Sequence, residues 1–251
     1  KYTSIQVYKY TSIQVYKYLC TCILVYVSTR LRRTCLLSLL LLMFITFEGP
    51  DGSGKSTQLQ QLAAWLRGRG VDVLPTREPG GTPIGDRIRT ILLDPACMEM
   101  ADEAEVLLYS AARAQHVVEV IRPHLSRGGV VLCDRFADST LAYQGHGRGL
   151  SLPTLATITQ FATGGLIPDL VVYLDLDVES GLRRKQVHAE NDASQWNRLE
   201  LAARAFHERV RAGYLQMAAA APERWLVVDG AEPIADVQAV IRQRVGAFLG
   251  L

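Results

Sequence analysis

A short segment around residue 50 combines glycines, a lysine and a serine in an order that can bind phosphate. It reads Gly49-Pro50-Asp51-Gly52-Ser53-Gly54-Lys55-Ser56 and fits the pattern G-x-x-x-x-G-K-[ST]. Glycines let backbone N–H groups close around phosphate oxygens, the lysine reaches the β- and γ-phosphates, and the serine can ligate Mg²⁺. Only two lysines, Lys55 and Lys185, follow Met43, against nineteen arginines. A compact ammonium at position 55 therefore stands out from the composition, and arginine could not replace it in a closed phosphate loop.

Charged residues follow two other apolar runs that are predicted to be strands. Arg77 comes after the run at residues 71–74, within the segment TREPGGT, where a second anion could lie. Asp134 and Arg135 directly follow the run at residues 130–133. A carboxylate beside a guanidinium favours Mg²⁺ or its water shell next to a phosphate group. For Arg77, a turn with a surface arginine is an equal alternative.

Aromatic and polar residues further along the chain could bind a nucleoside. Tyr109 and Arg113 are four residues apart in a helical pattern that follows Asp102, so they share one helix face. An aromatic plane beside a cation suits a nucleobase, and a core tyrosine beside a surface arginine is the alternative. Segment 139–149 collects polar and aromatic residues with three glycines. We expect a loop there, which either contacts a ligand or only connects two elements.

The elements that must position these residues alternate between short β-rich runs and longer helical patterns. The strand candidates are residues 44–47, 71–74, 130–133, 170–174 and 225–228. After the first strand, Leu59, Leu62, Ala63 and Leu66 mark one helix face, and the helix is predicted to end at Gly68 or Gly70. The alternation predicts a three-layer α/β/α fold whose parallel sheet has about five strands and binds ligands at their carboxyl ends.

The composition limits the class of protein. The 251 residues include 27 Lys+Arg, 25 Asp+Glu and 49% hydrophobic residues, which excludes a disordered chain and suits one substantial domain. The five cysteines are scattered and the five histidines lack metal-ligand spacing, so we expect a reducing compartment and no zinc site. Residues 43–251 hold 21 basic and 25 acidic residues, which gives no electrostatic case for nucleic-acid binding.

The first 42 residues differ from the rest of the chain. Residues 1–8 read KYTSIQVY and are repeated without change at residues 9–16. The segment has six basic residues and no acidic one, and its apolar runs are shorter than the roughly 18 to 20 residues that cross a bilayer. We favour upstream sequence translated ahead of a true start at Met43. A membrane-surface anchor or targeting peptide, and an extra ordered element, are the alternatives, and we take 43–251 as the domain.

Five segments of this domain read, in chain order, FEGPDGSGKST, TREPGGT, LLYSAARAQ, DRFADSTLAYQGHGRG and PDLVVYLDL. In their order and spacing they resemble the successive motifs of bacterial thymidylate kinases. The resemblance covers essentially all of residues 43–251. It implies a P-loop NTPase fold with a mobile lid and transfer of the ATP γ-phosphoryl group to dTMP, which gives dTDP for dTTP biosynthesis. It also implies Mg²⁺ and a cytoplasmic homodimer without a nucleic-acid or membrane partner.

The same resemblance implies roles for single residues. The nucleotide phosphates would be bound by the P-loop residues Gly49, Pro50, Asp51, Gly52, Ser53, Gly54, Lys55, Ser56 and Thr57. The catalytic residues would be Lys55, Asp51, Arg135, Arg198 and Arg184, and the Mg²⁺ ligands Ser56 and Asp134. The dTMP site would consist of Arg77, Tyr109, Arg113, Arg135, Ser139, Thr140, Tyr143 and Gln144. In this set Arg77 and Arg135 would hold the phosphate, and Tyr143 would disfavour a 2′-hydroxyl group.

The lid is predicted at residues 181–200, and it departs most from the bacterial pattern. The P-loop has no arginine in its variable positions, so a lid arginine is expected to supply the catalytic cation, and we favour Arg198 and Arg184. A solvated helix face is the alternative for Arg183 and Lys185. Two rival functions remain: a kinase for another nucleoside monophosphate, and a membrane-tethered nucleotide-binding module without turnover.

Overall fold

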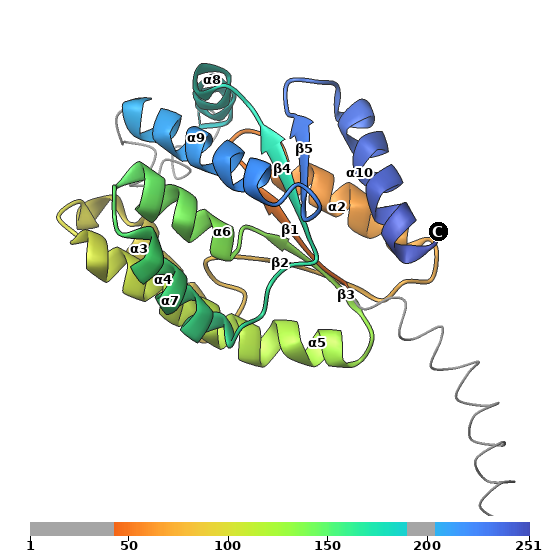
Figure 1. Ribbon diagram of the computed structural model, residues 1–251, viewed down its shortest axis with the longest axis horizontal. Coiled ribbons are helices and arrows are strands. Elements are labelled where there is room, and N and C mark those ends of the chain that lie inside the picture. The colour runs from red at the N-terminus through yellow and green to blue at the C-terminus, as the bar shows by residue number, and fades with distance from the viewer. Residues whose placement is uncertain (1–42, 190–203) are drawn as a thin grey trace, which may run out of the picture. The chain divides into compact units, whose positions relative to one another are not determined.

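Five parallel strands form one sheet in the computed structural model, which describes residues 43–189 and 204–251 (Figure 1). The strands lie in the order β2-β3-β1-β4-β5. Their bounds are β1 Met43–Glu48, β2 Val73–Arg77, β3 Val130–Asp134, β4 Leu170–Asp175 and β5 Trp225–Asp229. Helices connect them, as parallel strands require. The predicted three-layer α/β fold with a five-stranded parallel sheet is confirmed.

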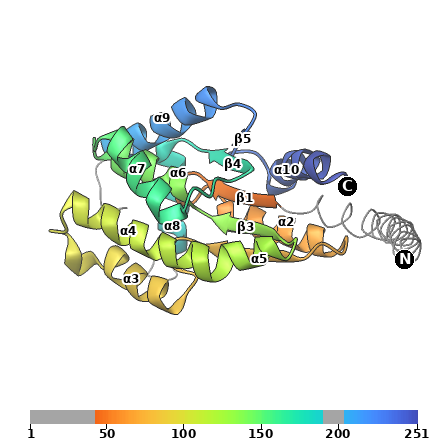
Figure 2. The same ribbon diagram turned by 60° about the horizontal axis from the view of Figure 1, so that its bottom comes forward.

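Helices cover both faces of the sheet (Figures 1 and 2). On one face α2 (Lys55–Arg67) and α10 (Ile234–Leu249) pack against each other. The other face carries α5 (Arg122–Ser126), α6 (Ala137–Thr140), the π-helical turns η2 (Val117–Ile121) and η3 (Leu141–Gly147), and α9 (Arg204–Ala220). Helix α4 (Asp102–His116) packs between α3 (Pro83–Leu93) and α7 (Leu152–Thr163). The remaining elements are the short 3-10 helix η1 (Pro95–Cys97) and α8 (Val178–Ala189).

The core explains why the strands have continuous apolar sequences. All six residues of β1 are buried, because helices cover the sheet on both sides. One apolar cluster joins Phe44 of β1 to Ile121 and Phe136. A second cluster packs the aromatic residues of α9 and η3 against Tyr173 and Trp225. These two clusters hold α5, η3 and α9 against the sheet. Because strands β1 and β3 are part of this packed core, the segments that follow them begin at fixed positions.

The parallel register brings the polar strand ends together. Phe47 of β1 and Arg77 of β2 both lie beside Asp134 at the end of β3. The P-loop starts directly after β1, and Gly54 caps α2 in the left-handed conformation with φ 92°. A side chain would be strained at this φ. The strand ends and the α2 N-terminus therefore form one polar surface.

Two sequence predictions about element bounds are wrong. The second strand is Val73–Arg77 rather than 71–74, because backbone pairing with β3 continues through Thr76 and Arg77 whatever their side chains. Segment 139–149 is largely helical rather than a loop. Its glycines permit close packing, since a Cβ on Gly147 would lie 2.6 Å from the ring of Phe206. The predicted end of α2 is confirmed, with Gly68 as its C-cap.

Residues 1–42 and 190–203 lie outside the described residues. The expectations about the first segment, the domain boundary at Met43 and most of the lid therefore stay predictions. Of the lid, the structure describes the part that belongs to α8. No helix in the described ranges is both long enough and apolar enough to cross a membrane.

Candidate functional site

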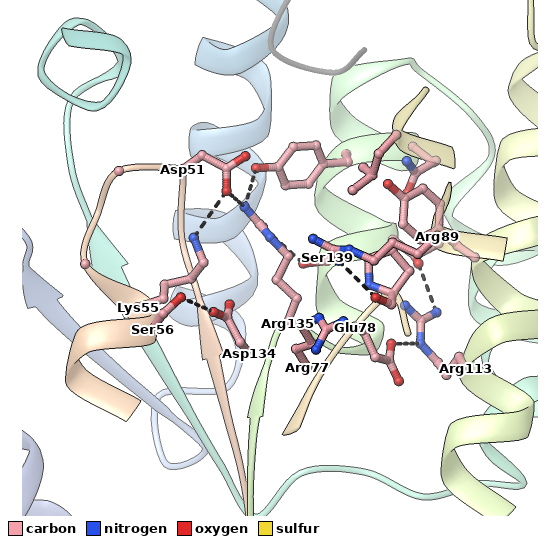
Figure 3. Close-up of a pocket in the computed structure, with 18 of the residues that line it drawn as sticks. Asp51, Lys55, Ser56, Arg77, Glu78, Arg89, Arg113, Asp134, Arg135 and Ser139 are labelled. Atoms are coloured by element: carbon pink, nitrogen blue, oxygen red, sulfur yellow. Dashed lines mark hydrogen bonds and ion pairs between the residues drawn. The ribbon is translucent and has the colours of Figure 1, made fainter. Parts of the chain in front are cut away.

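A pocket of about 410 Å³ opens at the carboxyl ends of β1, β2 and β3 (Figure 3). Most of the predicted site residues line it: Asp51, Gly52, Gly54, Lys55, Ser56, Thr57, Arg77, Tyr109, Arg113, Asp134, Arg135, Ser139, Thr140, Tyr143 and Gln144. The fold thus brings together residues that are up to 93 positions apart in the chain. Their roles stay predictions, but their positions agree with one shared site.

The P-loop forms one end of the pocket. The backbone at Gly49 has φ 140°, and a Cβ there would lie 2.5 Å from the carbonyl oxygen of Leu174. The Nζ of Lys55 donates to the carbonyl oxygens of Gly49 at 3.0 Å and Pro50 at 2.8 Å. Burial lowers the pKa of the Lys55 ammonium, Arg135 acts in the same direction, and Asp51 opposes both. The loop thus holds a buried cation against its own carbonyl groups.

Arg135 connects the P-loop with the wall of the pocket. Its Nη2 donates to Asp51 Oδ1 at 2.8 Å and to the Tyr143 hydroxyl at 3.1 Å. The residue has φ 68°, an uncommon value for a side chain other than glycine. Its backbone N–H donates to the carbonyl oxygen of Phe47 at 2.9 Å. This conformation points the guanidinium toward the P-loop, where Figure 3 shows it between Asp51 and Ser139.

Glu48 supports the segment that carries Arg135, and the sequence analysis missed it. Its buried carboxylate accepts hydrogen bonds from Phe136 N at 2.8 Å, Ser139 Oγ at 2.6 Å and the Tyr214 hydroxyl at 2.7 Å. Burial raises the pKa of Glu48 to about 7, although Arg135 and these hydroxyl groups act against the rise. All three donors are more than 80 positions from Glu48 in the sequence, so no local pattern could reveal the cluster.

Helix α4 forms the opposite end of the pocket. Arg113 is buried and donates to Glu78 Oε2 at 2.8 Å, Thr140 Oγ1 at 2.9 Å and the carbonyl oxygen of Phe136 at 3.1 Å. Three of its five N–H groups are thereby used, and the residue still lines the pocket. Tyr109, one turn earlier on the same face, lines it too. This end combines an aromatic ring with fixed hydrogen-bond donors.

Two oxygen groups meet near the start of α2. Ser56 Oγ donates to Asp134 Oδ2 at 2.6 Å. Hydroxyl and carboxylate oxygens are ligands that Mg²⁺ accepts, together with phosphate and water oxygens. Among the described residues no group of three or more His, Cys, Asp or Glu side chains could hold a metal by itself. The pair therefore suits an ion that a bound phosphate also ligates.

Some predicted residues lie outside this pocket. Gly49, Pro50 and Ser53 belong to the P-loop without lining the pocket. Arg184 of α8 donates to the carbonyl oxygen of Gly230 at 2.8 Å, and its Cβ approaches Gly52. Arg198 lies outside the described residues.

Arg77, one of the predicted site residues, lies at the rim of the pocket: its side chain is 54% exposed and forms an ion pair with Asp86 at 3.1 Å. Two further residues of the pocket, Glu78 and Arg89, were not among the predicted site residues. Arg89 donates to the carbonyl oxygen of Pro79 at 2.9 Å. Burial lowers the pKa of the Arg89 guanidinium, and the positive charge of Arg77 lowers it further. Glu78 sits inside the TREPGGT segment, which was a usable signal, whereas Arg89 is one helical arginine among many.

Comparisons with known proteins point to one family. A family model described as thymidylate kinase matches residues 47–241. A thymidylate kinase of Roseiflexus sp. strain RS-1 is 52% identical over 216 residues, which cover 82% of this chain and 93% of the relative. A thymidylate kinase of Pseudomonas savastanoi pv. phaseolicola is 55% identical over 197 residues, 78% of this chain and 91% of the relative. The crystal structure of thymidylate kinase from Ehrlichia chaffeensis superposes with a TM-score of 0.64 at 32% identity, over 81% of this chain and 98% of that one.

Proposed function

The chain belongs to the thymidylate kinase family, and we propose that it transfers the γ-phosphoryl group of ATP to dTMP. The products are ADP and dTDP, which supplies dTTP synthesis. One observation supports this best: a single pocket joins a P-loop at one end to Tyr109, Arg113 and Gln144 at the other. The rival functions, a kinase for another nucleoside monophosphate and a tethered binding module without turnover, are not favoured by these relatives.

The arrangement suits phosphoryl transfer without a covalent enzyme intermediate. A phosphate oxygen of dTMP attacks the γ-phosphorus of ATP, a new O–P bond forms, and the bond to the β-phosphate oxygen breaks as ADP leaves. Such a reaction depends on positioning and charge neutralisation. Lys55 and Arg135 are two cations that contact the same oxygen of Asp51, Oδ1, at 3.6 and 2.8 Å. We assign Lys55 to the ATP phosphates and Arg135 with Arg77 to the dTMP phosphate.

We place Mg²⁺ at Ser56 and Asp134, because this pair of oxygen groups lies beside Lys55 and fits a hard cation. When bound, the ion would neutralise charge on the nucleotide phosphates. Chelation of divalent metal is expected to abolish turnover. A Ser56→Ala variant should need a higher Mg²⁺ concentration for half-maximal rate than the wild type does.

We expect the catalytic cation of the lid to come from residues 181–200. Arg184 lies beside the P-loop on α8, and a Cβ at Gly52 would lie 2.6 Å from the carbonyl oxygen of Gly181. This close contact supports α8 as the element that covers the nucleotide. Arg198 keeps its predicted role as the second candidate.

We also propose that the protein acts as a homodimer in the cytoplasm, where its substrates are available. Exposed apolar side chains on neighbouring helices support an interface between two copies. Leu107 on α4 is 59% exposed, Val118 on η2 69% and Phe161 on α7 89%. Apolar surface of this kind usually marks an interaction site.

ADP release by the full chain with Mg²⁺ and ATP tests the proposed reaction. The acceptors are dTMP, dUMP, UMP, dCMP, dGMP and AMP. We expect release with dTMP above all, and a loss of at least about 100-fold in the Lys55→Ala variant. Arg69→Ala, at an exposed arginine just after α2, is the matched control and should keep full activity. Release that is equal with all acceptors, or unaffected by Lys55→Ala, would contradict the proposal.

A further inference from the structure

Glu105 lies on the face of α4 that forms the end of the pocket opposite the P-loop. We call this end, which is proposed to bind the nucleobase, the base end of the pocket. Positions 105, 109 and 113 follow each other at intervals of four, so Glu105, Tyr109 and Arg113 share this face. Tyr109 and Arg113 line the pocket, whereas Glu105 is completely buried just beyond it. A buried carboxylate is costly unless its oxygens are hydrogen-bonded or paired with a cation. Its partners therefore indicate what it does.

Among the described residues, Glu105 contacts an arginine and a pocket residue. Arg148 binds it with two parallel hydrogen bonds, Nε to Oε1 at 2.9 Å and Nη2 to Oε2 at 2.8 Å. Gln144, which lines the pocket, donates from Nε2 to Oε1 at 2.7 Å. A carboxylate in a bidentate pair with a guanidinium only accepts hydrogen bonds. It therefore requires the NH₂ group of Gln144, not the carbonyl oxygen, on its side.

This requirement fixes the other half of the amide. With its NH₂ group held by Glu105, the carboxamide of Gln144 must direct Oε1 away from the carboxylate. Within the described ranges no group donates a hydrogen bond to that oxygen. The pocket thus receives an acceptor from Gln144. Arg113 has two N–H groups that bind no atom of the described residues, and they supply donors at the same end.

We propose that Glu105 is a positioning residue that determines base specificity, because it holds the Gln144 amide so that its carbonyl oxygen faces the bound base. This inference rests on the proposed function. Thymine has an N3–H donor next to carbonyl acceptors, and it matches an acceptor from Gln144 beside donors from Arg113. Cytosine has an acceptor at N3 next to an amino donor, so the same fixed amide rejects it. Glu105 itself touches no substrate.

A single substitution separates this role from simple support of the fold. Glu105→Gln presents either an oxygen or an NH₂ group to Gln144, so the Gln144 amide can adopt both orientations. We expect the ratio of the dCMP to the dTMP specificity constant, kcat/KM, to rise at least about tenfold. The change should come from the KM for the acceptor, and the KM for ATP should stay the same. The matched control is Asp102→Asn, since Asp102 also pairs with Arg148, at 3.1 Å, without contacting Gln144. Its ratio should equal that of the wild type.

Exchanging the carboxylate and the amide between positions 105 and 144 gives the decisive comparison. Gln144→Glu places two carboxylates against each other and should weaken dTMP binding strongly. Adding Glu105→Gln lets the NH₂ group at position 105 donate to the carboxylate at position 144. The other oxygen of that carboxylate then faces the base as an acceptor, as the Gln144 carbonyl oxygen does in the wild type. We therefore expect the double variant to bind dTMP at least about tenfold more tightly than Gln144→Glu alone, and to prefer dTMP over dCMP as the wild type does. If Glu105→Gln alone does not fold, the comparison of the double variant with Gln144→Glu still tests the proposal.

Affinities for dTMP and dCMP, measured by calorimetry without ATP, keep the two proposals distinguishable. Absence of turnover with unchanged base selection would overturn the proposed reaction alone. An unchanged dCMP-to-dTMP ratio in Glu105→Gln, with both nucleotides weakened equally, would show that Glu105 only supports the fold. A double variant that fails to recover dTMP binding relative to Gln144→Glu would also overturn the inference.

Discussion

Tyr143 is the residue that is predicted to discriminate between sugars. Its ring lines the pocket and is 7% exposed, with Phe206 and Tyr214 packed edge-on at centroid distances of 6.1 and 6.3 Å. The Arg135 guanidinium lies 5.0 Å from the ring centroid. A ring held from three sides cannot move aside for an added hydroxyl group. This rigidity is the physical basis for its predicted discrimination against a 2′-hydroxyl.

We expect Tyr143→Ala to reduce the preference for dUMP over UMP by about tenfold, because the wall against a 2′-hydroxyl is removed. The two acceptors differ only in that hydroxyl, so the ratio of their kcat/KM values isolates the effect. Tyr143→Phe is the control: it keeps the ring, loses the hydrogen bond from Arg135 and should keep the ratio. An unchanged ratio in Tyr143→Ala would refute the assignment.

Glu48 should make stability depend on pH. Its ordinary pKa of 4.5 rises to about 7 in the folded protein because burial disfavours the charged carboxylate. Between these values the folded chain keeps a proton that the unfolded chain has released. The free energy of unfolding therefore falls as pH rises from about 4.5 to 7, by on the order of 3 kcal/mol in total.

Glu48→Gln removes this titration. We expect the stability advantage of the wild type over the variant to be largest near pH 5 and to shrink toward pH 8, measured by urea unfolding across the range. Glu223→Gln, at an exposed glutamate, is the control and should show a constant difference. A constant difference for Glu48→Gln as well would mean that its carboxylate titrates normally in the folded protein.

At the scale of elements, the contact between α9 and η3 sets the position of the pocket wall. A Cβ at Gly213 of α9 would lie closer to the His146 ring of η3 than atoms tolerate. Glycine to alanine within a helix normally stabilises by about 1 kcal/mol. We expect Gly213→Ala to do the opposite and destabilise by about 1–3 kcal/mol, because the backbone of α9 or the ring must move.

Gly246 of α10 offers a matched comparison. A Cβ there would lie 3.4 Å from the Leu251 carbonyl oxygen and 3.6 Å from the Trp65 ring, which are near-ordinary contacts. Gly246→Ala should therefore be neutral or stabilising. Thermal or denaturant unfolding of both variants measures the difference. Equal stabilisation by the two substitutions would show that α9 packs less tightly on η3 than the structure indicates.

The sequence was informative about elements whose signals are local. Strands buried on both faces have continuous apolar runs, and the P-loop is recognisable from its spacing alone. Segment 139–149 was misread because its glycines, which suggest a loop, serve close packing against α7 and α9 instead. The clusters around Glu48 and Glu105 could not be predicted, since each joins single residues from separate elements that become neighbours only in the fold.

At the scale of the whole molecule, α4 links the pocket with the proposed dimer interface. It turns Tyr109 and Arg113 toward the pocket, while Leu107 is 59% exposed on its outer side. A charge placed at the centre of an apolar interface has to be buried without a partner, which opposes association. Changes at Leu107 should therefore affect both assembly and the base end of the pocket.

We expect Leu107→Glu to convert the proposed homodimer to a monomer in light-scattering measurements at micromolar concentration. Because α4 then loses the support of the second copy, the KM for dTMP should rise several-fold while the KM for ATP, whose phosphates contact the P-loop, changes less. Val240→Glu, at an exposed position of α10 on the other side of the sheet, is the control and should leave assembly and both KM values unchanged. A wild type that is monomeric at this concentration would contradict the proposed dimer. A Leu107→Glu variant that stays dimeric would instead place the interface on another surface.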